Sequence, residues 1–231
     1  MLSIVWRIWG LRLRMLRKGV EIILSRDLCK VKNKTVLEVG CGDWPYAKNI
    51  LEKGGNCWGG LDMVKGVAQL KGSVGCIPFW DDTFDLVLCT QCFEHFFEYG
   101  ISFKKALGEI HRVLKPNGLL MLNTCVQNHG HPLLVNGDLK AVKELFAKED
   151  WDIKLFEKVI PKQRIKGWKR LSNKGVFSKV GYPTSMISNP KIGSYILNIH
   201  AKKRPWLNKK KKTKRRSIAL IGLRFLKEMI K

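Results

Sequence analysis

Acidic residues are scarce in this chain of 231 residues, which holds 19 Asp and Glu against 43 Lys and Arg. The scarcity is confined to the two ends. Residues 1–34 contain two acids and nine basic residues, and residues 161–231 contain one acid and 21 basic residues. Residues 35–160, in contrast, have 16 acids and 13 basic residues. Excess positive charge outside a near-neutral centre predicts an anionic partner, either acidic lipid or nucleic acid.

Long apolar runs are also missing. Basic side chains interrupt the apolar residues near the N-terminus, namely Arg7, Arg12, Arg14, Arg17 and Lys18. This spacing argues against the apolar core of a secretory signal peptide and against a spanning helix, which needs about 20 largely apolar residues. Ser3 alone supplies hydroxyl character there, which disfavours a mitochondrial transit peptide. We therefore expect a cytoplasmic protein.

The cysteines lack the spacing of a metal site. Seven are scattered along the chain, at positions 29, 41, 57, 76, 89, 92 and 125. Cys89 and Cys92 form a C-x-x-C pair, but no second Cys pair or His pair stands at zinc spacing. Most cysteines fall in or beside expected strands, where a free thiol behaves as a small hydrophobe. The sequence therefore predicts a reducing compartment and no bound metal.

The most informative stretch is Lys34–Trp44, with the sequence KTVLEVGCGDW. Thr35–Val39 has the length and β-branched content of a buried parallel strand, and Gly40 and Gly42 follow it directly. Next comes Tyr46–Lys53, which reads as a helix that ends at two glycines. A strand, a glycine turn and a helix form the first half of a nucleotide-binding unit, although a tight turn needs glycine even without a ligand.

Three later stretches strengthen the nucleotide-binding interpretation. Cys57–Leu61 reads as a second strand that ends at Asp62, 22 residues after Gly40, where such a unit places the acid that binds ribose hydroxyls. Ile77–Leu88 (IPFWDDTFDLVL) is a turn and an acidic loop before an apolar strand. Ile110–Leu122 (IHRVLKPNGLLML) is a helix end, a Pro and Asn-Gly turn, and another apolar strand.

Taken in order, these stretches resemble class I S-adenosylmethionine-dependent methyltransferases, most closely the methyltransferase type 11 domains. The resemblance covers about Lys34–Thr124 and continues more weakly to about Lys203. It implies an α/β fold: a three-layer Rossmann-like sandwich with a seven-stranded, mostly parallel sheet whose last strand is antiparallel. Trp151–Val159 and Ser194–Ala201 would be the final antiparallel pair. The implied cofactor is S-adenosyl-L-methionine.

The resemblance also assigns cofactor-binding positions. Glu38 would orient the glycine turn and the cofactor's amino group, and Asp62 would accept both ribose hydroxyls. The full set is Glu38, Gly40, Cys41, Gly42, Asp62, Met63, Ser73, Val74 and Gln91. Two positions depart from the family pattern: Ser73 replaces an acid expected near adenine, and Trp44 stands where a third glycine is common. The indole could cover the cofactor or fill the first turn of the helix.

Three histidines are candidates for a catalytic base. His95 lies in the stretch CTQCFEHF after the fourth strand, which closely resembles the family, and is also interpreted as a structural or cofactor-side residue. His129 and His131 follow the fifth strand, where substrates would enter, or else are solvated loop histidines. Some members of the family need no base.

The expected domain, residues 34–203, is flanked by basic segments. Residues 1–33 form an amphipathic helical extension that either caps the fold or lies in a membrane interface. A basic insertion at about 160–193 is either a substrate lid or docking loop, or a floppy segment. Residues 204–231 hold the run KKKKTKRR and an amphipathic stretch, a pattern for acidic membrane, RNA binding or a nuclear address.

The predicted function is methyl transfer by in-line displacement to a small molecule, or to a lipid-linked or glycan-linked acceptor at a membrane surface. The protein would then be cytoplasmic or peripheral on the inner face of a membrane. An RNA methyltransferase is the first alternative. A non-catalytic scaffold with the same fold is another, and the Rossmann-type dinucleotide oxidoreductase is disfavoured because the acidic loop and the KPNG turn have no role in it.

Overall fold

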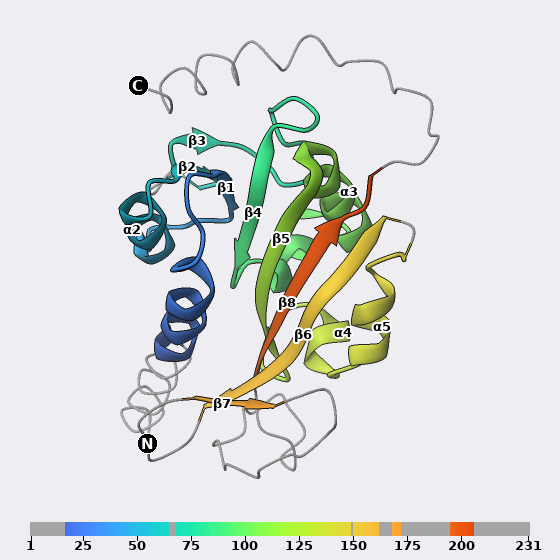
Figure 1. Ribbon diagram of the computed structural model, residues 1–231. Helices are drawn as coiled ribbons and strands as arrows, with labels where there is room; N and C mark the ends of the chain where they lie inside the picture. The colour runs from blue at the N-terminus through green and yellow to red at the C-terminus, as the bar shows by residue number, and fades with distance from the viewer. Residues whose placement is uncertain (1–16, 65–67, 149, 162–167, 172–194, 206–231) are drawn as a thin grey trace.

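The computed structural model describes residues 17–64, 68–148, 150–161, 168–171 and 195–205, which form one sheet with helices on both faces (Figure 1). The strands are β1 (Thr35–Val39), β2 (Cys57–Asp62), β3 (Leu70–Lys71), β4 (Phe84–Thr90), β5 (Leu114–Val126), β6 (Trp151–Pro161), β7 (Trp168–Leu171) and β8 (Tyr195–Lys203). The helices are α2 (Tyr46–Lys53), the 3-10 helix η1 (Phe93–Tyr99), α3 (Phe103–Val113), α4 (Pro132–Val135) and α5 (Leu139–Glu144), with a further helical segment at residues 17–28.

The sheet has the strand order β3-β2-β1-β4-β5-β8-β6-β7. Strands β1 to β5 pair in parallel, and β8 is antiparallel to both of its neighbours, β5 and β6. The expected three-layer sandwich with an antiparallel last strand is therefore confirmed. The sheet has one strand more than the seven expected, because β7 adds to its edge through antiparallel pairing with β6.

Side chains alternate between the two faces of the central strands, as a period of two requires. On β4, Val87 and Cys89 pack with α3, whereas Leu86 and Leu88 pack with α2 and residues 17–28. Because both faces of these strands are buried, their sequences read as continuous apolar runs and not as an alternating pattern. This explains why the runs were visible in the sequence.

The helical residues 17–28 cap one face of the sheet. Val20, Ile23, Leu24 and Leu28 are almost completely buried against it. The capping interpretation of the N-terminal extension is confirmed for this half, whereas residues 1–16 lie outside the described part of the chain. Within that part no helix has the length and apolar content needed to cross a membrane.

Polar contacts fix this helix to the last two strands. Asp27 accepts hydrogen bonds from Arg26, from Asn198 (2.9 Å) and from His200 (3.1 Å), and Arg26 also pairs with Glu157 of β6. Burial by itself would raise the pKa of Asp27, but the hydrogen bonds from His200, Arg26 and Asn198 outweigh it and hold that pKa well below its usual value. The charged form of Asp27 therefore holds the helix to β8.

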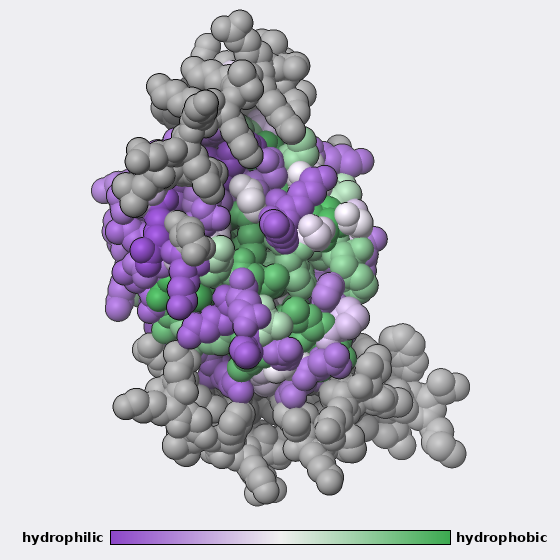
Figure 2. Space-filling model, turned by 90° about the vertical axis from the view of Figure 1, so that its right-hand side faces the viewer, coloured by the Kyte–Doolittle hydropathy of each residue, from purple (hydrophilic) through white to green (hydrophobic). Residues whose placement is uncertain are grey.

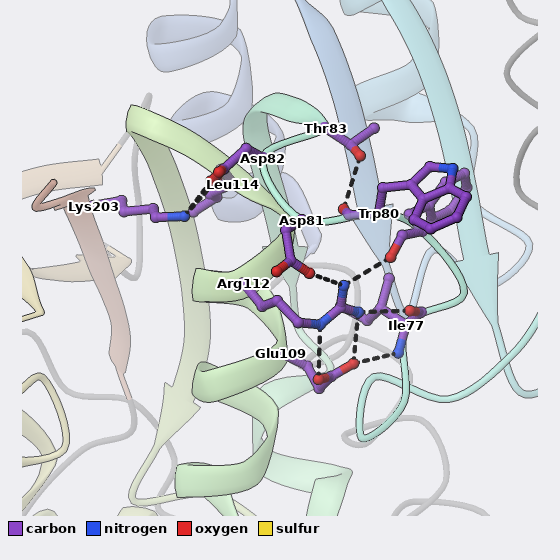
Figure 3. A network of polar contacts seen from close by, with 10 residues as sticks. Ile77, Trp80, Asp81, Asp82, Thr83, Glu109, Arg112, Leu114 and Lys203 are labelled. Atoms are coloured by element: carbon purple, nitrogen blue, oxygen red, sulfur yellow. Dashed lines mark hydrogen bonds and ion pairs between the residues drawn. The ribbon is translucent and has the colours of Figure 1, made fainter. Parts of the chain in front are cut away.

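The acidic loop before β4 is held by one side chain of α3, Arg112 (Figure 3). Its guanidinium donates to the carbonyl oxygens of Ile77 (2.8 Å) and Phe79 (2.7 Å), to Asp81 and to Glu109. Glu109 in turn accepts from the backbone N–H of Ile77 at 2.9 Å. This loop continues the segment that forms a wall of the site described below, so the network fixes that wall to α3.

A second contact in the same region fixes the end of the sheet. Lys203, the last residue of β8, is 2% exposed and donates to Asp82 (2.7 Å) and to the carbonyl oxygen of Leu114 (2.6 Å). The acidic residues of the loop therefore bind basic side chains from α3 and β8 (Figure 3).

Helix α3 ends where the sequence indicated. After Val113 the chain enters β5, and residues 115–118 bulge out between the pairs Phe84–Leu114 and Leu86–Leu119, with Asn117 at a positive φ of 66°. The Asn-Gly turn therefore lies within the pairing of β4 and β5 and sets their register.

One expectation along the chain was wrong in detail. The sequence predicts a short helix or turn over residues 64–70, but Leu70 pairs with Leu61, and Lys71 with Asp62, as β3. A two-residue strand is too short to show a periodicity in the sequence, so its pairing with β2 determines that it is a strand.

The basic insertion at 160–193 is described only in part, and its described residues belong to β6 and β7. Most of it, like the C-terminal tail, lies outside the described residues.

The side of the molecule at the right of Figure 1 carries hydrophobic residues in the middle, bordered by hydrophilic ones (Figure 2). The elements nearest this side are α5 and β6, whose partly buried apolar residues include Leu139, Ile153 and Phe156. These residues pack against the core from its outer side.

Candidate functional site

The candidate site lies where the strand order reverses. The chain proceeds from β1 outwards to β2 and β3, and then returns across β1 to form β4 on its other side. In open α/β sheets such a reversal leaves a crevice at the carboxyl ends of the two strands. The glycine turn follows β1 here, and η1 follows β4.

The glycine turn is shaped by contact with β4 and the segment after it. Gly40 has φ of +65°, and a Cβ placed on it would lie 2.5 Å from the Cβ of Cys92. The thiol of Cys92 donates to the carbonyl oxygen of Val39 at 3.1 Å. Both the backbone conformation and the lack of space therefore require glycine at position 40.

Asp62 at the end of β2 is tied to this turn. Its Oδ2 accepts from the backbone N–H of Gly42 at 2.8 Å, and its Oδ1 accepts from the N–H of Val64 at 2.8 Å. The carboxylate is thus held in one orientation beside the turn. Each oxygen keeps a lone pair for a further hydrogen bond, because a carboxylate has about four acceptor sites.

Glu38 is buried beneath the turn. It is 4% exposed, and its Oε2 accepts from the indole Nε1 of Trp58 at 2.8 Å. Burial raises the pKa of Glu38 from 4.5 to about 7, although the bond from Trp58 lowers it. A carboxyl group with this pKa changes charge near neutral pH, which the sequence did not reveal.

A cavity of about 370 Å³ opens beside the turn. Four of the predicted cofactor positions line it, namely Gly40, Asp62, Met63 and Val74. The histidine that lines it is His95. Sequence reasoning missed the other lining residues, which are Leu61, Gly72, Cys92, Phe96, Glu98, Tyr99 and Ile101. Many of these come from η1, whose aromatic-rich sequence FEHFFEY carries no helical periodicity that would have indicated a wall.

Other predicted cofactor positions have their side chains engaged elsewhere. The Cys41 side chain packs in the core beside α2, and burial raises the pKa of its thiol to about 12. Gln91 donates to Asn123 at 3.0 Å and accepts from the Cys125 thiol, so its amide is bound to β5. Ser73 accepts from the N–H of Gly75 at 3.1 Å. These side chains do not line the cavity.

The Trp44 indole does not line the cavity either. It stacks on Tyr46 with ring centroids 5.4 Å apart, and the guanidinium of Arg17 lies 4.8 Å from its ring centroid. Trp44 therefore connects the turn to the N-terminal helix and leaves the hollow over the glycines open.

The three candidate histidines are separated by the structure into a pair and a single residue. His95 and His129 approach with their Nε2 atoms 3.2 Å apart, and Nδ1 of His95 bonds to Glu98 at 2.8 Å. His131 instead caps α4, because its Nδ1 accepts from the N–H of Leu133 at 3.1 Å. Its ring packs against Phe97 and Phe103.

Residues 37–122 match the profile of a family described as methyltransferase domain. This segment runs from β1 into β5 and includes the glycine turn, Asp62 and η1. The resemblance inferred from the sequence is therefore confirmed over the central part of the chain.

Curated relatives match short parts of this chain. An uncharacterized methyltransferase-like protein of Schizosaccharomyces pombe is 51% identical over 51 residues, which are 22% of this chain and 18% of that protein. An uncharacterized protein of Methanocaldococcus jannaschii is 38% identical over 82 residues, 36% of this chain and 28% of that protein. The chain thus spans less than a third of the length of these relatives.

Solved structures share the fold over most of the chain. The structure of a SAM-dependent methyltransferase from Aquifex aeolicus superposes with a TM-score of 0.52 at 19% identity, and the match covers 85% of this chain and 96% of that one. At this level of identity the likeness concerns the fold.

Proposed function

We propose that this protein is an S-adenosylmethionine-dependent methyltransferase that binds its cofactor in the cavity between the ends of β1 and β4. The observation that carries the proposal is the fixed carboxylate of Asp62, which lines that cavity and is oriented by backbone N–H groups of the glycine turn and of Val64. A nucleoside needs such an acceptor pair for its ribose hydroxyls.

Each wall of the cavity has a distinct part in this proposal. Gly40 leaves bare backbone against which the methionine portion of the cofactor lies. Asp62 accepts hydrogen bonds from the ribose, and Met63, Val74 and Ile101 provide apolar contact for the adenine. Glu38 lies under the turn and supports it through Trp58. The site is thus polar at one end and apolar at the other, as nucleoside sites are.

The bound cofactor supplies a sulfonium methyl group: a lone pair of the acceptor forms a bond to the methyl carbon while the carbon–sulfur bond breaks and its electron pair stays on sulfur. The leaving group is good, so the protein mainly holds the reactants in line. Such placement can supply about 7–11 kcal/mol of the barrier. A proton that the acceptor loses would pass to a base or to water.

Titration calorimetry with S-adenosylhomocysteine tests the proposal. Asp62→Ala removes an ionic acceptor of hydrogen bonds, so we expect at least about 30-fold weaker binding, or about 2 kcal/mol. Asp152→Ala is the matched control, because Asp152 pairs with Lys154 on β6 and lies away from the cavity lining.

Circular dichroism confirms that both variants are folded before the titrations are compared. Folded wild-type protein that does not bind the compound would refute the proposal, and so would equal affinity of wild type and Asp62→Ala.

We further propose that the acceptor is a small molecule, or a lipid-linked or glycan-linked molecule, presented at an acidic membrane surface. The support is the charge distribution, because residues 161–231 hold 21 basic residues and one acid. A polybasic run beside an amphipathic stretch provides two weak membrane signals, which together are enough for stable association.

Flotation with acidic and neutral liposomes tests this proposal, with an RNA gel shift across a salt series in parallel. Binding to acidic liposomes that persists at high salt would support it, since apolar insertion is not screened. RNA binding that falls steeply with salt, without flotation, would favour an RNA acceptor instead. Binding of the cofactor without turnover on any fractionated extract would indicate a non-catalytic scaffold.

A further inference from the structure

A buried carboxylate and two imidazoles meet beside the proposed cofactor cavity. One ligand-type atom from each of Glu94, His95 and His129 lies within 4.8 Å of the others. Glu94 and His95 belong to η1, whereas His129 comes from the loop after β5, 34 residues later. We propose that these three side chains form a binding site for a divalent transition-metal cation such as Mn²⁺, Fe²⁺, Co²⁺ or Zn²⁺.

The spacing of the imidazole nitrogens supports this proposal. The two Nε2 atoms are 3.2 Å apart. Ligand atoms that bind one cation at about 2.0–2.1 Å are themselves separated by about 2.8–3.0 Å in octahedral geometry and by about 3.3–3.4 Å in tetrahedral geometry. The imidazole pair therefore has about the separation of two ligands of one cation, and a carboxylate oxygen of Glu94 lies within 4.8 Å of both.

The hydrogen bond on the far side of His95 indicates the same role. Its Nδ1 lies 2.8 Å from Oε1 of Glu98. When Nδ1 carries the proton and donates it to the carboxylate, Nε2 keeps its lone pair and points towards His129. Metal-binding histidines usually donate their second N–H to a carboxylate or carbonyl group, which fixes the tautomer and the ring orientation. Glu98 provides this contact here.

Glu94 is a buried carboxylate whose hydrogen bonds come from neutral groups, and it also interacts electrostatically with His95. Its side chain is 1% exposed, and Oε2 accepts from the hydroxyl of Thr124 at 2.7 Å. The other groups bonded to it are backbone N–H groups, those of Glu94 and Cys125. Buried carboxylates are normally paired with a cation or coordinate a metal. A metal ion would compensate this charge.

The loop that carries His129 is shaped to approach η1 closely. Gly130 has φ of +97°, and a Cβ placed on it would lie 2.6 Å from the Cβ of Glu94. The N–H of His131 donates to the carbonyl oxygen of Glu94 at 3.0 Å. The glycine and this backbone hydrogen bond together hold His129 over η1, so the juxtaposition of the three side chains is specified by the fold.

The cation would act on the acceptor. Three protein ligands leave coordination positions open, and both His95 and Glu98 line the cavity, so an open position would face the site of methyl transfer. A hydroxyl bound there loses its proton to water more readily, and the resulting oxygen lone pair attacks the methyl carbon as the carbon–sulfur bond breaks. This role rests on the proposed methyl transfer, whereas binding of the cation does not. It predicts an oxygen acceptor.

Metal titration of the chelator-treated full chain tests the site. Mn²⁺ is followed by calorimetry and Co²⁺ by its visible absorption, which distinguishes nitrogen and oxygen ligands from thiolates. We expect one cation per chain, bound at least about tenfold more weakly by His129→Asn, and about 10–100-fold more weakly by Glu98→Gln. His131→Asn is the matched control, because it alters the same loop, and Asn also caps helices. Its affinity should equal that of wild type.

Titration of S-adenosylhomocysteine into the same chelated samples separates this inference from the proposed function. Cofactor-product binding without specific Mn²⁺ or Co²⁺ binding would overturn the metal site and leave the methyltransferase proposal intact. A thiolate spectrum, or equal cation affinity of wild type and folded His129→Asn, would also overturn it. Cation binding without binding of the cofactor product would support the metal site and refute the proposed function.

Discussion

Glu38→Gln should abolish a large pH dependence of the stability of this protein. The Glu38 carboxyl lies beneath the glycine turn with 4% exposure, and burial raises its pKa from 4.5 to about 7. Gln is nearly isosteric and its Oε1 can still accept from the indole N–H of Trp58. The substitution therefore removes the titration and keeps the hydrogen bond.

The sign and size of the effect follow from proton linkage. The folded chain holds the Glu38 proton up to about pH 7, whereas the unfolded chain releases it near pH 4.5. Between these values the folded state binds more protons, so the free energy of unfolding falls as the pH rises. The shift corresponds to about 3 kcal/mol, and about 2.5 kcal/mol of it is lost between pH 5 and pH 8.

Urea unfolding of wild type and Glu38→Gln at pH 5 and pH 8 measures this quantity. The other titratable groups are present in both proteins and contribute equally to the change in the free energy of unfolding between pH 5 and pH 8. Their contributions cancel when the change in the variant is subtracted from the change in wild type. We expect wild type to lose about 2.5 kcal/mol more than the variant over this range. If the two proteins lose the same free energy of unfolding, the carboxyl does not titrate near neutrality and the reasoning from its burial is wrong.

Three further predictions concern contacts that hold the site together. Arg112→Met should lower the free energy of unfolding by about 2–4 kcal/mol in urea, because it removes the donor to the carbonyl oxygens of Ile77 and Phe79 and the cation that pairs with Glu109. Lys154→Met should change it by less than about 1 kcal/mol, and equal effects of the two substitutions would contradict this. Gly40→Ala should destabilise the fold more than Gly42→Ala. Both glycines have positive φ, but a Cβ at position 40 would clash with Cys92, whereas a Cβ at position 42 meets open space. Thermal melts that rank the two variants the other way would count against the turn geometry. Asp27→Asn should cost about 2 kcal/mol at pH 7, and this deficit should shrink as the pH falls below the ordinary carboxyl pKa of 3.8 towards the depressed pKa of Asp27. A deficit that stays constant down to pH 2 would argue against the charged contact.

Local sequence was enough to locate the central elements. Strands β1 and β4, helix α2 and the glycine turn were predicted at the positions where they occur, because buried parallel strands give continuous apolar runs and glycines mark their ends. Asp62 could be placed beside the turn for the same reason, since the length of a strand–turn–helix–strand unit fixes its spacing.

Other features depended on contacts between distant segments. The part of the η1 wall that Glu98 and Tyr99 form was missed, and the acidic loop before β4 gave no sign that Arg112 would hold it. The pairing of His95 with His129 spans 34 residues and requires the close approach of Gly130 to Glu94.

The sequence by itself determined the fold class and the position of the glycine turn, because hydrophobic period and backbone freedom are properties of neighbouring residues. Only the tertiary structure decided which side chains face the cavity and which meet each other, because those depend on strand order, register and loop approach. For that reason Gln91 and Cys41 lie outside the cavity lining, whereas Glu98 and Tyr99 form part of it. The environment of Glu38 was settled in the same way, since its pKa depends on burial that no local pattern reports.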